Sequence, residues 1–208
     1  MQSELAHLLG DGGIALQDLT IRFSAIDAKS SGDPNPTEIE PVYSLSEQLF
    51  VEPEPLLARS SFGDDRIINS TRQEIAVARS HIEVWKLIAA SSCDYGLILE
   101  DDVYFSSDAP KLIDQAWSDL HDRFGAHGSI DMLYLSYREA GPATKNRFVS
   151  DAVFRPLRGF WQMSGYVLSR TGAQRLLELM PVRGPVDLWI NHQFEKINVF
   201  ATSRSVIG

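Results

Sequence analysis

Apolar and polar residues along this chain alternate between the periods of helices and strands. Apolar residues recur at helical spacing through Arg72–Ala90 and gather on one arc of that helix. Directly afterwards, Tyr95–Leu99 is a short apolar run with the length of a buried strand. The remaining expected elements are, in order, helix Ser3–Leu9, strand Leu19–Phe23, helix Lys111–Phe124, strand Asp131–Leu135, strand Gln162–Leu168, helix Gly172–Met180, a short helix from Asp187 and strand Val199–Ala201.

This order of elements predicts an α/β fold with a mostly parallel central sheet flanked by helices. The chain has 208 residues, of which 44% are hydrophobic, so it can bury one sizeable core. Neither an internal repeat nor a low-complexity tract divides the sequence. We therefore expect residues 1–208 to form a single domain.

Composition narrows the partners and the compartment. The net charge of −9 offers no basic surface that would make nucleic acid the default partner. No apolar run has the length of a transmembrane helix. The single cysteine, Cys93, excludes an internal disulfide and suits a reducing compartment. These features favour a cytoplasmic location.

One segment, at about residues 30–60, is unlike the rest. From Asp33 to Pro55 it holds six carboxylates and five prolines but no lysine or arginine. Such a composition predicts an extended, poorly packed surface loop. A lid over a ligand site is the alternative.

The acidic triplet Glu100-Asp101-Asp102 directly follows the apolar run 95–99. Ligands of α/β sheets bind beyond the carboxyl ends of strands, where this triplet lies. If the backbone stays extended, Glu100 and Asp102 share one side and Asp101 points away. Carboxylate oxygens suit Mg²⁺ or Mn²⁺, whose shell is usually completed by water and a substrate phosphate. The alternative is a solvated turn or a cluster at a helix start.

Two polar residues, Glu74 and His81, fall within the apolar arc of the helix at 72–90. Buried polar groups need partners. For Glu74 the structural explanation is a capping box with Thr71, and for His81 it is a hydrogen-bonded core histidine. The functional alternative is that both side chains face a crevice that holds a ligand.

Several motifs together resemble a known family. They are, in chain order, Arg22–Ala28, Glu74-Ile75-Ala76, Ser80-His81, Trp85, Leu97–Val103, Gly165–Ala173 and Pro185–Trp189. The set resembles glycosyltransferase family 25, which includes bacterial lipooligosaccharide galactosyltransferases and animal collagen galactosyltransferases. The motifs cover most of the chain in the family's order, whereas the acidic triplet alone would be a weak signal.

The resemblance implies a GT-A fold and inverting transfer of a hexose from a nucleotide sugar, with UDP-galactose as the leading donor. A glycan or a lipid-linked glycan would be the acceptor, which allows peripheral association with the inner face of a membrane. The metal, Mn²⁺ or Mg²⁺, would be bound by Asp102 with Glu100 and His192 as further ligands. The residues expected to contact the donor are Glu100, Asp101, Asp102, Asp27, Glu74 and His81.

An inverting transfer needs a base for the acceptor hydroxyl, and Asp187 is the candidate. Its structural alternative is the N-cap of a helix that begins at Leu188. Phe160 and Trp161 are candidates for stacking on an acceptor sugar, although aromatic residues also fill cores. His192 has a structural alternative too, because a lone histidine on a short helix is usually part of the packing.

The resemblance also leads us to expect that the family's first strand and a carboxyl-terminal tail are missing from this chain. Three functions follow from the sequence. The first is a metal-dependent glycosyltransferase. The second is a truncated, non-catalytic relative that binds a nucleotide sugar. The third is a hydrolase with paired carboxylates, which we place last because no matching pattern of acids is visible.

Overall fold

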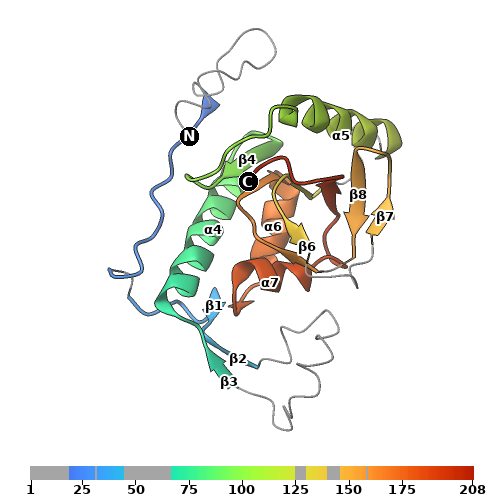
Figure 1. Ribbon diagram of the computed structural model, residues 1–208. Helices are drawn as coiled ribbons and strands as arrows, with labels where there is room; N and C mark the ends of the chain where they lie inside the picture. The colour runs from blue at the N-terminus through green and yellow to red at the C-terminus, as the bar shows by residue number, and fades with distance from the viewer. Residues whose placement is uncertain (1–18, 31, 45–66, 125–129, 140–145, 158) are drawn as a thin grey trace.

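The computed structural model describes residues 19–30, 32–44, 67–124, 130–139, 146–157 and 159–208. Its helices are α4 (Arg72–Ala90), α5 (Ala109–Phe124), α6 (Arg170–Glu178) and α7 (Val186–Asn191). Its strands are β1 (Ile39–Glu40), β2 (Val42–Ser44), β3 (Ile67–Asn69), β4 (Tyr95–Leu99), β5 (Met132–Tyr134), β6 (Arg138–Glu139), β7 (Asn146–Phe148), β8 (Val153–Pro156), β9 (Phe160–Trp161), β10 (Gly165–Ser169), β11 (Val182–Arg183) and β12 (Val199–Thr202) (Figure 1). The expected helix Ser3–Leu9 lies outside the described residues.

The central sheet has six strands in the order β4-β10-β5-β12-β8-β7. The α/β class is confirmed, but the expectation of a mostly parallel sheet is wrong. Among the described strands of this sheet, only β5 and β12 pair in parallel, whereas β10 runs antiparallel to both β4 and β5. An apolar run such as 97–99 does not report the direction of the neighbouring strand. Here it lies on the edge strand β4, which is only partly buried, with Leu97 43% exposed. The sequence pattern therefore could not distinguish a parallel sheet from this mixed one.

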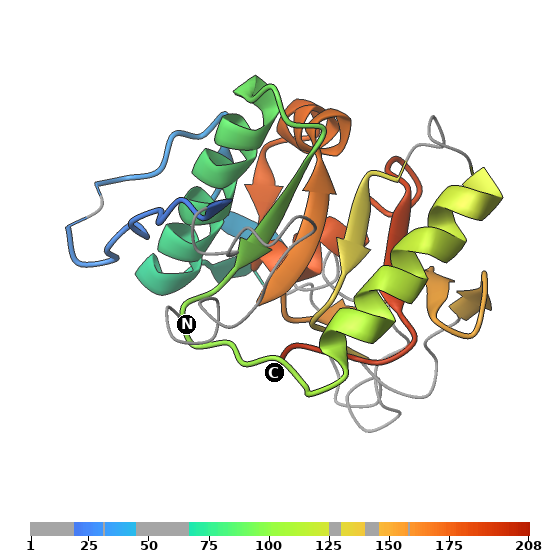
Figure 2. The same cartoon turned by 90° about the horizontal axis from the view of Figure 1, so that it is seen from above.

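Alternate side chains of β5 enter two separate cores. Met132 and Tyr134 belong to a core with α4, α6 and α7, whereas Leu133 lies in a second core with α5. This division follows from the period of two along a strand. The result is a sheet between two helical layers, and Figure 2 shows α5 on the side of the sheet opposite α4.

Helix α4 begins and ends as the sequence predicts. Thr71 caps it, with the Glu74 N–H donating to the Thr71 hydroxyl at 3.2 Å and the Thr71 N–H donating to the Glu74 carboxylate at 2.7 Å. The capping box is thus confirmed. Ile82 and Trp85 are fully buried against the sheet, so the apolar arc fixes which side of α4 faces the core.

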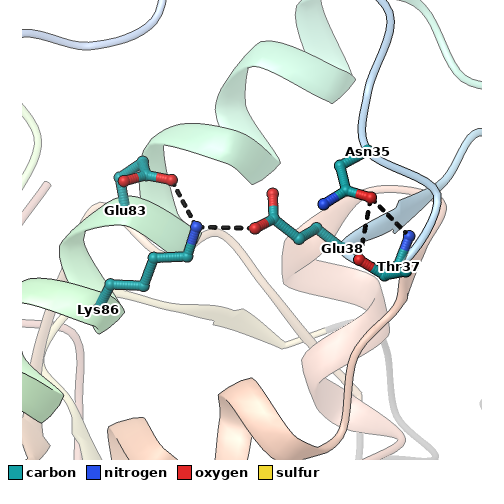
Figure 3. A network of polar contacts seen from close by, with 5 residues as sticks. All are labelled: Asn35, Thr37, Glu38, Glu83 and Lys86. Carbon is teal, nitrogen blue, oxygen red and sulfur yellow. Dashed lines mark hydrogen bonds and ion pairs between the residues drawn. The ribbon is translucent and has the colours of Figure 1, made fainter.

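The acidic, proline-rich segment is ordered in its described first half, which corrects the expectation of a poorly packed loop there. Ile39 is only 2% exposed, and β1 pairs in parallel with β11. Lys86 on α4 donates to both Glu38 and Glu83 at 2.7 Å (Figure 3). An apolar residue at 39 and a salt bridge to α4 therefore anchor a segment whose composition alone suggests a loop. Residues 45–66 are not described, so the lid stays untested.

The expected strand Leu19–Phe23 is wrong: within the described residues 19–30, no strand forms. Leu19 and Ile21 are 67% and 88% exposed, so the alternation of this segment does not reflect burial on a sheet. The segment is anchored on α4 instead, where the Ile26 N–H donates to the Ser80 hydroxyl at 2.9 Å. In the described part of the chain, no helix is long and apolar enough to span a membrane.

Candidate functional site

A half-open pocket of about 530 Å³ lies beyond the carboxyl end of β4. Its size falls in the range of small-molecule sites, about 300–1,000 Å³. Five parts of the fold meet there: the first turns of α4, the residues after β4, the link between β9 and β10, the start of α7, and Gly208. The lining residues are Gln73, Glu74, Val77, His81, Glu100, Asp102, Val103, Gln162, Met163, Ser164, Pro185, Val186, Asp187 and Gly208.

The acidic triplet divides as expected, although by a different backbone route. Glu100 and Asp102 line the pocket, and Asp101 does not. The backbone forms a turn at 101–102 instead of staying extended. The Glu100 N–H donates to the Ser164 carbonyl oxygen at 2.9 Å, which ties the end of β4 to the β9–β10 link. The turn then brings Asp102 back to the same side as Glu100.

The pocket carries concentrated negative charge. The pKa of Glu100 is raised, chiefly because the pocket walls desolvate its carboxylate although part of the side chain reaches solvent. A hydrogen bond from Ser164 lowers that pKa, and the charges of Asp102, Asp101 and Asp187 raise it. Neither lysine nor arginine is among the described residues that line the pocket. A bound cation would relieve this repulsion.

The residues fit a divalent ion that keeps open coordination positions. Among the described residues, no three histidine, cysteine or acidic side chains come together as a complete metal site. Two carboxylates plus a substrate diphosphate are the set that Mg²⁺ commonly uses. The structure brings Glu100 and Asp102 to the pocket but not His192, which is the C-cap of α7 and lies outside the lining.

Glu74 both caps α4 and lines the pocket. Its Oε2 accepts hydrogen bonds from the Thr71 backbone N–H and hydroxyl, and the same residue lines the pocket. Within the described part of the chain, Oε1 has no hydrogen-bond partner. Capping therefore fixes the side chain while leaving one oxygen for a ligand.

His81 is buried, yet the residue is part of the pocket lining. Its Nδ1 lies 2.9 Å from the Tyr166 hydroxyl, which also accepts a hydrogen bond from Trp85 Nε1 at 3.0 Å. Burial lowers the pKa of His81 to about 4, so the ring is neutral at neutral pH. Because Trp85 can only donate, all three groups are satisfied when the Tyr166 hydroxyl donates to Nδ1. That arrangement places the remaining ring proton on Nε2.

Asp187 is not the N-cap of α7, which corrects one of its two interpretations. The cap is Pro185, and Asp187 lies in the first turn. Its Oδ1 accepts from the Leu188 N–H at 3.0 Å, and its Oδ2 accepts from the Gln162 N–H at 3.2 Å. Each oxygen keeps a further lone pair, so the carboxylate is oriented by the backbone and can still accept a proton in the pocket.

The sequence analysis missed Asn191, which ties the start of β9 to α7. Asn191 is 1% exposed and its Oδ1 accepts from the Gly159 and Phe160 N–H groups at 3.0 and 2.9 Å. Its Nδ2 donates to the Phe160 and Asp187 carbonyl oxygens, both at 2.7 Å. Its place four residues after Asp187 was the available signal, because that spacing puts both on one helix face.

The other predicted residues lie away from the pocket lining. Phe160 is 1% exposed and stacks on Tyr137 with ring centres 4.4 Å apart, so its ring fills the core and faces no ligand. Trp161 is 50% exposed and directly precedes Gln162 of the lining, which leaves it available at the rim. Asp27 is exposed and its carboxylate accepts from the Lys29 N–H.

Comparisons with known proteins point to one family. The sequence model of glycosyltransferase family 25, described as an LPS biosynthesis protein, matches residues 15–190. Procollagen galactosyltransferase 1-B of Xenopus laevis is 29% identical over 136 residues, which are 61% of this chain and 21% of that protein.

A glycosyltransferase 25 family member of Drosophila melanogaster is 28% identical over 61% of this chain and 20% of its own length. The inactive glycosyltransferase 25 family member 3 of Homo sapiens is 27% identical over 61% of this chain and 21% of its own length. The chain thus spans about a fifth of the curated relatives that it matches. Because the family model covers most of its length, the chain belongs to glycosyltransferase family 25.

Proposed function

We propose that the chain is a metal-dependent, inverting hexosyltransferase that uses a UDP-sugar, with galactose as the leading sugar. The observation that carries this proposal is the pocket in which Glu100 and Asp102 after β4 meet Asp187 of α7. A GT-A arrangement is part of the proposal, supported by acidic residues at a strand end of an α/β sheet. So is a cytoplasmic location, at the inner membrane face where the acceptor glycan is lipid-linked.

Asp102 and Glu100 would hold Mg²⁺ or Mn²⁺ at the pocket. When bound there, such an ion stabilises the negative charge that grows on the leaving diphosphate. The Ser164 hydroxyl orients Glu100, and Asp101 remains outside. The three acidic residues thus differ in place: Glu100 and Asp102 line the pocket, whereas Asp101 does not.

Asp187 is the proposed base. The carboxylate accepts the proton of the acceptor hydroxyl as that oxygen attacks the anomeric carbon opposite the leaving group. The backbone N–H groups of Gln162 and Leu188 fix its orientation. His81 acts differently: its Nε2–H donates a hydrogen bond to the donor from the wall of the pocket, and its neutral ring adds no charge.

Asp187→Asn tests the base directly. The amide keeps the size of the side chain and one acceptor oxygen, so UDP-galactose still binds. Transfer, measured as UDP released with a panel of free glycans as acceptors, should fall by about 10²–10⁴-fold, the usual contribution of a general base. Asp114→Ala, which changes an exposed residue of α5, is the control. Unchanged transfer in Asp187→Asn would limit Asp187 to a structural role.

A second candidate is a non-catalytic relative that binds a nucleotide sugar. It is favoured by the human relative, which is named inactive. In that case the protein binds UDP-galactose but releases no UDP with any acceptor, and Asp187→Asn changes neither property. The hydrolase has no comparable support, because the family to which the chain belongs is one of glycosyltransferases.

A further inference from the structure

Gln162 has an unusual backbone conformation. Its φ of 73° lies in the left-handed region, and it is the one non-glycine residue with positive φ in the described part of the chain. A non-glycine residue there is strained by about 1 kcal/mol or more. Glutamine has no special tolerance for this conformation, unlike asparagine or glycine. Strain of this kind concentrates at functional sites and persists only where the surroundings enforce it.

The neighbouring elements enforce the conformation from both sides. On the α7 side, Asp187 accepts the Gln162 N–H, and Asn191 holds Gly159 and Phe160 through three hydrogen bonds. On the β4 side, the Glu100 N–H donates to the Ser164 carbonyl oxygen. The backbone is thus fixed at residues before, at and after Gln162, and Gln162 itself lines the pocket.

We propose that the Gln162 carboxamide binds the hydroxyl groups of the transferred hexose and thereby favours the sugar-bearing donor over the free nucleotide. The inference rests on the proposed function. Gln162 lies in direct contact with Asp187, and a base for the acceptor hydroxyl must lie beside the anomeric carbon. A neutral amide offers both a donor and an acceptor, which matches sugar hydroxyls, whereas a diphosphate is matched by a cation.

The test compares the Kd values of UDP-galactose and of UDP, each measured by calorimetry with Mn²⁺. In Gln162→Gly the left-handed backbone is unstrained and the amide is lost. We expect an unchanged Kd for UDP and a Kd for UDP-galactose that rises by about two- to tenfold, the effect of one or two neutral hydrogen bonds. Gln162→Asn tolerates the backbone with a shorter amide, and it should show the same selective loss if the glycine variant fails to fold.

The matched control is Gln115→Ala, which changes an exposed residue of α5. This variant should bind both ligands as the wild type does. Equal loss of both ligands in Gln162→Gly, or loss of neither, overturns the inference and leaves the nucleotide site standing. A wild-type protein that binds UDP and UDP-galactose equally well also overturns it. A wild-type protein that binds neither overturns the proposed function and this inference with it.

Discussion

His81 illustrates how burial sets the chemistry of one residue. Seven percent of it is exposed, and its Nδ1 is occupied by Tyr166. The sequence offered a core histidine and a ligand-facing histidine as alternatives, and in the structure His81 is a hydrogen-bonded core residue that also lines the pocket. Periodicity placed His81 on the inner arc of α4 correctly. It could not show that Tyr166, 85 residues further along the chain, would fix the tautomer.

The stability of the protein should depend on pH through His81. Its pKa is about 4 when folded, whereas an unperturbed histidine has a pKa near 6.5. As the pH falls, the unfolded chain therefore takes up the proton before the folded protein does. The free energy of unfolding has its full value above about pH 6.5 and decreases as the pH falls towards 4. The loss amounts to about 3 kcal/mol.

Urea unfolding of the wild type and of His81→Gln at pH 7.5 and pH 4.5 measures this effect. The variant should lose less stability between the two pH values than the wild type. His121→Gln on α5 is the control and should follow the wild type. An identical loss in His81→Gln and the wild type would show that the ring is not held neutral by burial.

At the scale of elements, α7 connects the proposed base, Asp187, to the pocket wall. This helix has only six residues, yet Asp187 and Asn191 on it bind four backbone groups of residues 159–162. The sequence predicted the helix and its aspartate. It could not predict the contacts, because the residues they join are 25 to 32 positions apart and meet only in the folded sheet.

Asn191→Ala should both destabilise the protein and impair transfer. It leaves the Gly159 and Phe160 N–H groups without a partner in a buried site, at a cost of about 2–4 kcal/mol in the free energy of unfolding. Transfer should fall further than UDP binding, because the link that carries Gln162 loosens beside Asp187. Chemical denaturation and the transfer assay measure the two effects.

Asn191→Asp is the matched variant, since it keeps the acceptor for both N–H groups but loses the donor to the Phe160 and Asp187 carbonyl oxygens. It should also be less stable than the wild type, because a carboxylate oxygen then faces these two carbonyl oxygens in a buried site. Equal stability of Asn191→Ala and the wild type would mean that the link is held in place without α7.

At the scale of the molecule, sequence patterns predicted most of the long elements that build the two cores. They predicted α4 and β4 with the observed bounds, because the helical arc and the apolar run are each set by local burial. They failed for strand direction and for β8, whose pairing with β12 joins residues distant in the chain, and they missed β7, which forms a local hairpin with β8. Of the candidate site, the charged residues that line the pocket were found, and the amides Gln162 and Asn191 were missed, because an uncharged amide does not stand out from other polar residues in the sequence.

The molecule as a whole has a net charge of −9, and its pocket gathers acidic residues from separate elements. The proposed donor, a UDP-sugar, is itself an anion, so its binding in this pocket would require a cation to offset the repulsion. This requirement is the central claim of the account. The claim concerns the charge of the whole pocket. It can be tested within the triplet after β4, because Asp102 lines the pocket and the neighbouring Asp101 does not.

The most direct test is a calorimetric titration of UDP-galactose into the wild type, Asp102→Asn and Asp101→Asn, each with Mn²⁺ and with a chelator. The account predicts that the chelator and Asp102→Asn each weaken binding by at least about tenfold. Asp101→Asn, which removes the same charge outside the pocket lining, should bind as the wild type does. Metal-independent binding, or equal losses in the two variants, would contradict the account.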